Sequence, residues 1–169
     1  MILEALYYFV PAYFANLVPP LVQWIPFLNK PINKKYFGNH KTWRGFVFAC
    51  LFGLLFFYIQ KLLYQVSFFQ NISIINYSET TIWFGLIMGF GAIFGDLIKS
   101  YFKRKAKVAP GKSWIPFDQM DYVIGGLLFS FIIFIPSTIT IFVILIMSSL
   151  LPPVFHYTGY LLGINKDKI

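Results

Sequence analysis

The chain has 169 residues, of which 58% are hydrophobic and only 12% are charged, and its formal net charge is +8. Soluble domains carry about 25% charged residues, and a fold of this size could not hide so much apolar surface, so an ordinary soluble domain is excluded. The length fits one domain, residues 1–169, and the composition favours a membrane protein. The positive charge alone could suggest a nucleic-acid partner, but it gathers in loops between apolar stretches, and we expect no nucleic acid.

The first uncharged stretch, residues 5–29, is long enough for one membrane crossing, which takes about 20 residues. Pro11, Pro19 and Pro20 predict a broken or kinked helix there. A cleaved signal peptide is the alternative, but it needs a basic segment before its apolar core. The residues before this stretch include Glu4 and no basic side chain, so the pattern favours a span.

Two further spans are predicted at residues 45–60, continuing past Lys61 toward Phe69, and at residues 80–95, running on to Ile98. Glycines at a spacing that lets helices approach closely occur in the second of these, as Gly85-x-x-x-Gly89 and Gly91-x-x-x-Gly95. Packing between helices of one chain is their simpler use, and a dimerisation face is the other.

Residues 122–165 are too long for one span and suit two, with the most turn-like sequence, "IPST", at residues 135–138. The first of these two spans is short, and Pro152 and Pro153 should interrupt the second. The sequence thus predicts an all-α integral membrane protein with about five transmembrane helices.

The distribution of basic residues predicts the orientation of these spans. Five spans place the termini on opposite sides, and the basic residues gather at residues 30–44, at 99–112 and in the C-terminal tail, with only Lys61 elsewhere. The positive-inside rule then puts the N-terminus outside and the C-terminus in the cytoplasm, in a multi-pass protein of the cell membrane. The basic loops need do no more than set this topology and touch anionic headgroups.

Asp96 lies near the end of the third span, where an ionisable side chain is costly and is by default a functional hypothesis. If the helix continues, Asp96, Lys99, Ser100 and Lys103 share one face. An internal ion pair from Asp96 to Lys99 or Lys103 is the purely structural alternative, and the sequence leaves both open.

Asp118 and Asp121 stand three residues apart where the fourth span begins, so a helix would place them on one face. Acidic residues are favoured near a helix start, so capping alone could explain Asp118. Two carboxylates held close repel each other without a cation, however, and carboxylates with phosphate oxygens are the usual ligands of Mg²⁺. Beside the basic loops, the pattern indicates Mg²⁺ and a polyphosphate substrate in phosphoryl or nucleotidyl transfer.

Three motifs occur in order: Lys41-Thr42-Trp43-Arg44-Gly45, then Phe94-Gly95-Asp96 followed by "IKSYFKR" after Leu97, and Pro116-Phe117-Asp118-Gln119-Met120-Asp121. With the span count, they resemble the CDP-diglyceride synthases, which are integral-membrane cytidylyltransferases, and more closely their archaeal relatives, the CDP-archaeol synthases. The resemblance covers nearly the whole chain. Gln119 stands where the bacterial branch has arginine, so no arginine role is carried over.

The resemblance implies a CTP-dependent nucleotidyltransferase with a single transmembrane cytidylyltransferase domain. It would transfer CMP from CTP to an archaeal ether-lipid phosphate in the bilayer, 2,3-di-O-geranylgeranylglyceryl phosphate, and release CDP-archaeol and pyrophosphate at the cytoplasmic face. A phosphate monoester is already largely dianionic near neutral pH, its second pKa being about 6. Positioning and charge neutralisation would then suffice without a strong general base.

The resemblance also implies roles for individual residues. Asp96, Asp118 and Asp121 would hold Mg²⁺ and, with Lys103, form the catalytic set. The expected substrate-binding residues are Asn39, Lys41, Thr42, Arg44, Lys99, Ser100, Arg104 and Lys112. The lipid tails would lie in a groove between spans, open to the bilayer.

Three alternatives remain open. A CDP-diacylglycerol synthase would run the same chemistry on phosphatidate, although the short chain and the "PFDQMD" motif disfavour it. A small anion transporter would need no paired aspartates beside its basic loops. A membrane anchor without catalytic activity would need no Asp96 at the membrane edge.

Cysteine labelling tests the predicted orientation. We expect Lys34→Cys and Lys107→Cys, each in a Cys50→Ser background, to react with a membrane-impermeant maleimide only from the cytoplasmic side, because both basic loops should face that side. Labelling of the two positions from opposite sides would rule out the five-span arrangement.

Overall fold

The structure, a computed structural model, describes residues 1–108, 114 and 117–161, with side chains up to residue 150. Its regular elements within these ranges are α1 (Ile2–Tyr8), α2 (Val10–Leu21), α3 (Lys34–Phe37), α4 (Trp43–Leu63), α5 (Ser67–Asn71), α6 (Trp83–Lys105), α7 (Phe117–Ser130) and α8 (Thr138–Leu161). An isolated β-bridge joins Pro31 and Thr42, and no strand forms in this part of the chain. The predicted all-α class is therefore confirmed for the described residues.

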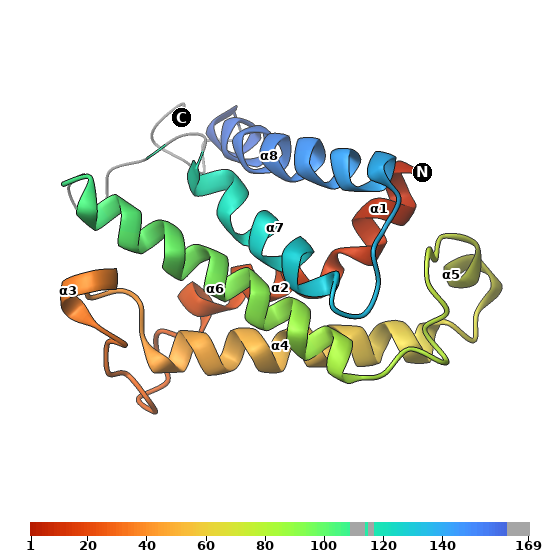
Figure 1. The fold of residues 1–169 in the computed structure, drawn as a ribbon, viewed down its shortest axis with the longest axis horizontal. Coiled ribbons are helices and arrows are strands. Elements are labelled where there is room, and N and C mark those ends of the chain that lie inside the picture. Colours follow the sequence, from red (N-terminus) through yellow and green to blue (C-terminus); the bar gives the residue numbers. More distant parts are fainter. Residues whose placement is uncertain (109–113, 115–116, 162–169) are drawn as a thin grey trace.

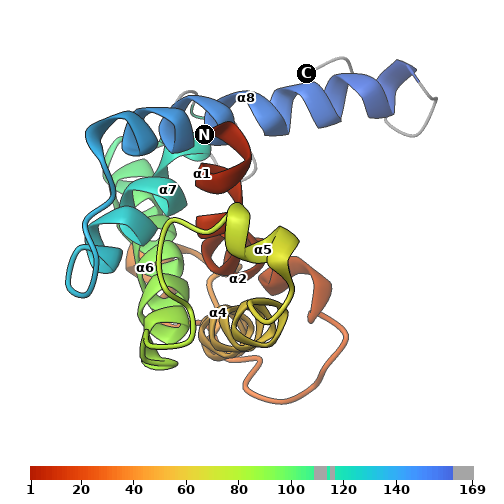
Figure 2. The same ribbon diagram turned by 90° about the vertical axis from the view of Figure 1, so that its right-hand side faces the viewer.

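Helix α6 lies at the centre of the fold (Figure 1). It packs against α4 and against α7, while α2 contacts both α4 and α6, and the short α3 also touches α6. Helix α8 packs on α7 and α1 and projects beyond the other helices (Figure 2). Segments that are far apart in the sequence therefore meet along α6.

Within the described residues, α4 and α6 are the two helices long and apolar enough to cross a membrane, at 21 and 23 residues. Leu51, Leu55, Tyr58 and Leu62 follow one face of α4 and stay exposed. An apolar stripe left uncovered along a whole helix is expected where the surrounding solvent is lipid.

Residues 2–21 form two helices, α1 and α2, and residues 22–29 of the predicted span are not helical. The chain breaks at Phe9, directly before Pro11 enters the first turn of α2, and α2 ends at Leu21 with Pro19 and Pro20 inside it. The predicted break is confirmed. The predicted turn at residues 135–138 is also confirmed in place, because α7 ends at Ser130 and α8 begins at Thr138.

Two predicted helix limits are wrong. Helix α4 ends at Leu63 instead of continuing toward Phe69, because the chain folds back over its end: the Lys61 ammonium donates to the carbonyl oxygens of Tyr77 and Thr80, both at 2.7 Å. Helix α8 runs through Pro152 and Pro153 without interruption. A proline pair costs hydrogen bonds and crowds the preceding turn, but proline's fixed φ of about −65° is itself helical, and here the helix continues.

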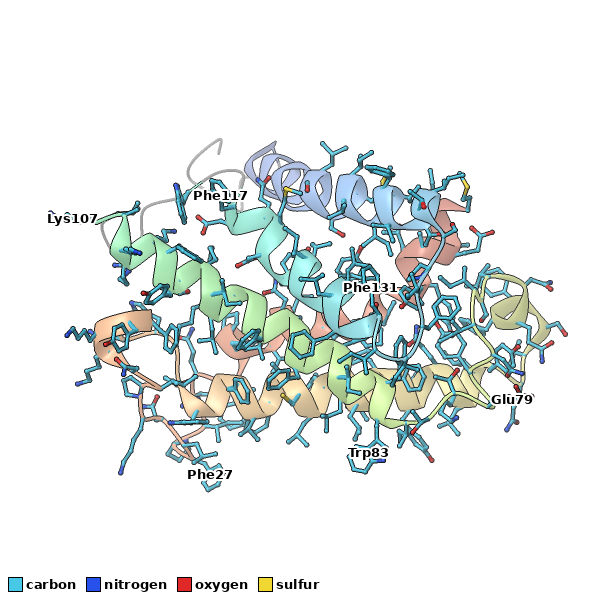
Figure 3. The ribbon with its side chains drawn as sticks, viewed as in Figure 1. Phe27, Glu79, Trp83, Lys107, Phe117 and Phe131 are labelled. Atoms are coloured by element: carbon cyan, nitrogen blue, oxygen red, sulfur yellow. The ribbon has the colours of Figure 1, made fainter. Side chains whose placement is uncertain are left out.

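The two basic loops lie at one end of the α4–α6 pair. Lys107, which follows α6, lies at the same end as α3, whereas Glu79, which precedes α6, lies at the other end (Figures 1 and 3). The loop between α2 and α4 therefore meets the end of α6, as expected if both loops face one side of a membrane.

Glycines set the distance between the central helices. Gly53 of α4 faces Gly85 of α6, and Gly95 of α6 faces Gly125 of α7, and a Cβ at any of these positions would overlap backbone atoms of the partner helix. The predicted glycine spacing therefore serves packing within the chain. At Gly95 the obstructing atom is the carbonyl oxygen of Asp121. This contact therefore also sets the distance between the aspartates of α6 and those of α7.

We expect Gly95→Ala to lower the free energy of unfolding by about 1–3 kcal/mol, because the added methyl group would overlap backbone that cannot move aside easily. Gly45→Ala is the matched control: it gives α4 the same gain in helix propensity, and the three atoms nearest to its Cβ would be side-chain atoms, of Pro19 at 3.2 and 3.7 Å and of Thr42 at 3.6 Å. Thermal unfolding in detergent compares the two. Equal unfolding temperatures would contradict the close α6–α7 contact.

Candidate active site

The last turns of α6 carry a polar face directed at neighbouring elements. Helix α6 continues to Lys105, so Asp96, Lys99, Ser100 and Lys103 do share one face, as the sequence predicted for a continuous helix. Asp96 and Ser100 are buried, and the Ser100 hydroxyl donates to the carbonyl oxygen of Asp96 at 2.8 Å. This face lies toward the start of α7 and the loop before α4.

The three predicted aspartates meet at one atom, the Nζ of Lys99. This ammonium lies 3.1 Å from Oδ1 of Asp96, 3.1 Å from Oδ1 of Asp118 and 2.7 Å from Oδ2 of Asp121. Three carboxylates from two helices therefore converge on one ammonium. The structural alternative for Asp96, an internal ion pair with Lys99, is present in the same arrangement.

Two further lysines flank this cluster. Lys41 forms an ion pair with Asp96, and the Lys103 ammonium binds both carboxylate oxygens of Asp118, at 3.1 and 3.0 Å. Three ammonium groups and three carboxylates thus alternate and balance in charge. We call this set of six side chains, Lys41, Asp96, Lys99, Lys103, Asp118 and Asp121, the carboxylate–lysine cluster.

Backbone groups hold the two aspartates of α7 in place. The N–H of Trp114 donates to Oδ2 of Asp118 at 2.5 Å, and the N–H of Tyr122 donates to Oδ1 of Asp121 at 2.7 Å. The Lys103 ammonium binds the same carboxylate, so the Asp118 side chain is held from two directions.

The loop before α4 places Lys41 beside Asp96. The N–H of Ile32 donates to the carbonyl oxygen of Lys41 at 2.8 Å, and the N–H of Trp43 donates to that of Lys30 at 3.1 Å, so the loop closes on itself. Thr42 then caps α4 by accepting from the N–H of Gly45 at 3.2 Å. Lys41 is thus the last residue before a fixed helix start.

Two cavities of opposite character adjoin the cluster. A polar cavity of about 360 Å³ lies between the basic loop and α6, and an apolar one of about 490 Å³ lies between α6 and α7. The apolar cavity is lined by Phe94, Ile98 and Phe102 of α6 and by residues of α7, with Asp121 among them. Lys99 lines both cavities.

Most of the predicted substrate-binding residues line the polar cavity. They are Asn39, Lys41, Lys99, Ser100 and Arg104, and the predicted catalytic Lys103 joins them. Lys34, Phe37, Gly38 and His40 line it as well and were not predicted. The basic character of residues 30–44 was the available signal for Lys34. The predicted groove between spans corresponds to the apolar cavity, and the spacing of Phe94, Ile98 and Phe102 could have indicated its wall.

Two predicted substrate-binding residues that the structure describes, Thr42 and Arg44, stand apart from the polar cavity. Thr42 lines a separate small pocket of about 30 Å³ beside Asp96, and its hydroxyl is used in capping. Arg44 is 4% exposed, its guanidinium donates to the carbonyl oxygen of Ile25, and it lines neither cavity. In the structure Arg44 ties the segment after α2 to α4, and its expected contact with phosphate stays a prediction. Lys112 lies outside the described residues.

The cluster has the donors that a hard cation requires. Among the residues that the structure describes, no three His, Cys, Asp or Glu side chains are already placed as ligands of one metal ion, because the Lys99 ammonium takes the central position. The donor set itself, three carboxylates directed at one point without nitrogen or sulfur ligands, fits Mg²⁺.

Comparison with known proteins identifies the family. A family model described as CarS-like, CDP-archaeol synthase, matches residues 1–168. The chain belongs to this family. The resemblance predicted from the three motifs is confirmed.

Curated CDP-archaeol synthases from three organisms illustrate the similarity. That of Thermococcus kodakarensis is 31% identical, over 94% of this chain and 91% of the relative. That of Pyrococcus furiosus is 30% identical, over 89% and 87%, and that of Methanococcus maripaludis is 30% identical, over 96% and 92%. No solved structure matches the chain.

The three motifs on which the resemblance rests meet in space at the carboxylate–lysine cluster. Lys41 comes from the first motif, Asp96 from the second, and Asp118 and Asp121 from the third, although almost 80 residues separate the first from the last. Helix α6 makes this possible because it contacts both the α3 segment and α7.

The hydrogen bond from the Arg44 guanidinium to Ile25 has a measurable consequence. We expect Arg44→Met to lower the free energy of unfolding by about 1.5–3 kcal/mol, the usual contribution of a hydrogen bond to a charged group. Lys105→Met, at the exposed end of α6, is the control and should have little effect. If Arg44 served phosphate binding instead, its variant would keep the wild-type unfolding temperature.

Proposed function

We propose that the chain transfers CMP from CTP to the phosphate of 2,3-di-O-geranylgeranylglyceryl phosphate, giving CDP-archaeol and pyrophosphate. Membership of the CDP-archaeol synthase family supports the reaction. The observation that carries the proposal for this site is the position of the carboxylate–lysine cluster, at the boundary between a basic polar cavity and an apolar one.

The two cavities suit two substrates of opposite solubility. CTP is a water-soluble polyanion, and the polar cavity offers it Lys34, Lys41, Lys103 and Arg104. The lipid's isoprenoid tails need an apolar wall, which Phe94, Ile98 and Phe102 supply along α6. The lipid phosphate would then lie at Lys99 and Asp121, the charged residues that line the apolar cavity.

In the proposed reaction an oxygen of the lipid phosphate attacks the α-phosphorus of CTP, and the bond from that phosphorus to the β-phosphate oxygen breaks. The attacking oxygen is already anionic near neutral pH, so no protein group has to remove a proton. The side chains of the cluster would instead hold the reacting groups in line and offset the negative charge on the departing pyrophosphate. Lys103 and Arg104 are placed on the polar side for this task.

Asp96, Asp118 and Asp121 would hold Mg²⁺. When bound, this ion would supply positive charge between the phosphate groups of the substrates. Two polyanions do not approach each other without such compensation, and the cluster alone has no net charge to offer, since its three lysines balance its three aspartates.

We also propose that the chain crosses the cell membrane about five times, with the N-terminus outside and the site at the cytoplasmic face. Helices α4 and α6 support this by length and composition. The broken α1–α2 pair would form one crossing, and the short α7 and the longer α8 would form the last two. The basic loops at one end of α4 and α6 support the cytoplasmic location.

The direct test incubates purified protein with Mg²⁺, labelled CTP and the ether-lipid phosphate. We expect a CDP-lipid to form and its formation to stop with EDTA. Phosphatidate is the competing substrate, and a clear preference for it would favour a CDP-diacylglycerol synthase. Absence of a CDP-lipid from either substrate would contradict the proposed reaction.

Asp118→Asn and Asp121→Asn should each lower kcat/KM for CTP about a hundredfold or more, since each removes a negative charge that would hold the Mg²⁺ beside the reacting phosphates. Asp96→Asn combined with Asp121→Asn should cost far less than the product of the single losses, because residues acting as a unit are not additive. Glu79→Gln, an acid neutralised at the opposite end (Figure 3), is the control. Losses that multiply would mean that Asp96 acts apart from Asp121.

A further inference from the structure

The position of Lys99 is unusual because one ammonium contacts three carboxylates. Its Nζ lies 2.7–3.1 Å from Asp96, Asp118 and Asp121, whereas Lys41 and Lys103 each pair with a single carboxylate of the cluster. The Asp96 and Asp121 side chains are only 10% and 5% exposed. An ordinary ion pair between residues i and i+3 of a helix would join Lys99 to Asp96 alone, whereas here Lys99 also contacts Asp118 and Asp121.

We propose that Lys99 is a placeholder cation for the divalent metal: it holds the three carboxylates together before the metal enters and gives up that position when the metal binds. The inference rests on the proposed function, because it assumes that these aspartates are the metal ligands. It concerns a positioning role for Lys99, in addition to the contact with substrate expected from the sequence.

The need for a placeholder follows from the packing of α6 on α7. Asp96 follows Gly95 directly, and Gly95 lies against the backbone of Asp121, so the two carboxylates cannot move far apart. Without a cation their repulsion would act against that close contact. The Lys99 ammonium provides the cation from within the chain, and the α6–α7 contact survives without metal.

The need for displacement follows from size. Oxygen ligands surround Mg²⁺ at about 2.0–2.1 Å, whereas the carboxylate oxygens here surround Nζ at 2.7–3.1 Å. The two cations cannot occupy one point, so an entering metal pushes the ammonium out. Lys99 lines both cavities, so the displaced ammonium stays at the boundary where the phosphates of both substrates would meet.

A metal titration without nucleotide or lipid tests the proposal. The full-length protein in detergent is stripped with EDTA, and Mn²⁺ binding is followed by the loss of the free-ion electron paramagnetic resonance signal. We expect Lys99→Gln to bind Mn²⁺ at least about tenfold more tightly than wild type, because the competing cation is gone. Lys105→Gln loses the same charge from the same helix and makes no ion pair with the described residues, so its affinity should match wild type.

Thermal unfolding gives a second signature. Metal-free Lys99→Gln should unfold at a lower temperature than wild type, and Mn²⁺ should raise its unfolding temperature by more than it raises that of wild type. A merely structural ion pair would give the lower temperature without the tighter metal binding. Unchanged or weaker Mn²⁺ binding by Lys99→Gln would therefore overturn the proposal.

Wild-type protein provides a test that needs no variant, should Lys99→Gln fail to fold. The Lys99 amine is labelled with a small acylating reagent, with and without saturating Mn²⁺, and quantified by mass spectrometry against Lys105. Displacement predicts that Mn²⁺ increases labelling of Lys99 alone, and unchanged labelling would contradict it.

Neither measurement depends on turnover, so a failed placeholder is distinguishable from a failed synthase assay. Absence of Mn²⁺ binding by any variant would overturn the metal site and the placeholder together.

Discussion

Carboxylates gathered in a poorly hydrated site repel one another, so a cation must hold them together, and in this protein the Lys99 ammonium does so for Asp96, Asp118 and Asp121. The attraction is strong because these side chains are largely withdrawn from water. It also joins two helices, since Asp96 and Lys99 belong to α6 whereas Asp118 and Asp121 belong to α7. The site and the α6–α7 contact therefore depend on each other.

Small residues let the helices around this cluster come close enough to bring the charged side chains together. Gly95 and Gly125 let α6 and α7 approach until backbone touches backbone, and Gly53 with Gly85 does the same for α4 and α6. Close packing of this kind replaces the hydrophobic effect, which does not drive helices together in lipid. It also leaves room on either side of α6, where one cavity is basic and polar and the other is apolar. A reaction between a nucleotide and a lipid needs such a boundary.

The predictable part of the fold came from patterns that act locally. Apolar runs indicated membrane helices, and α4 and α6 are indeed long and apolar enough to cross a membrane. Helix limits were less predictable: α4 stops before Phe69 because Lys61 binds carbonyl groups of a loop that is distant in sequence, and α8 passes through Pro152 and Pro153. In both cases the local sequence pattern did not determine where the helix ends.

The sequence by itself determined the solvent, the basic end of the molecule, the three motifs and the shared face of Asp96, Lys99, Ser100 and Lys103, because composition and helical period are properties of a single segment. Only the tertiary structure decided what that face meets. It placed Lys99 among three carboxylates and buried Arg44 against the carbonyl oxygen of Ile25, although both residues read from the sequence as phosphate ligands. The physical reason is that an ammonium or guanidinium binds whichever acceptor the packing brings within about 3 Å, and packing joins segments whose order along the chain does not reveal their distance in space.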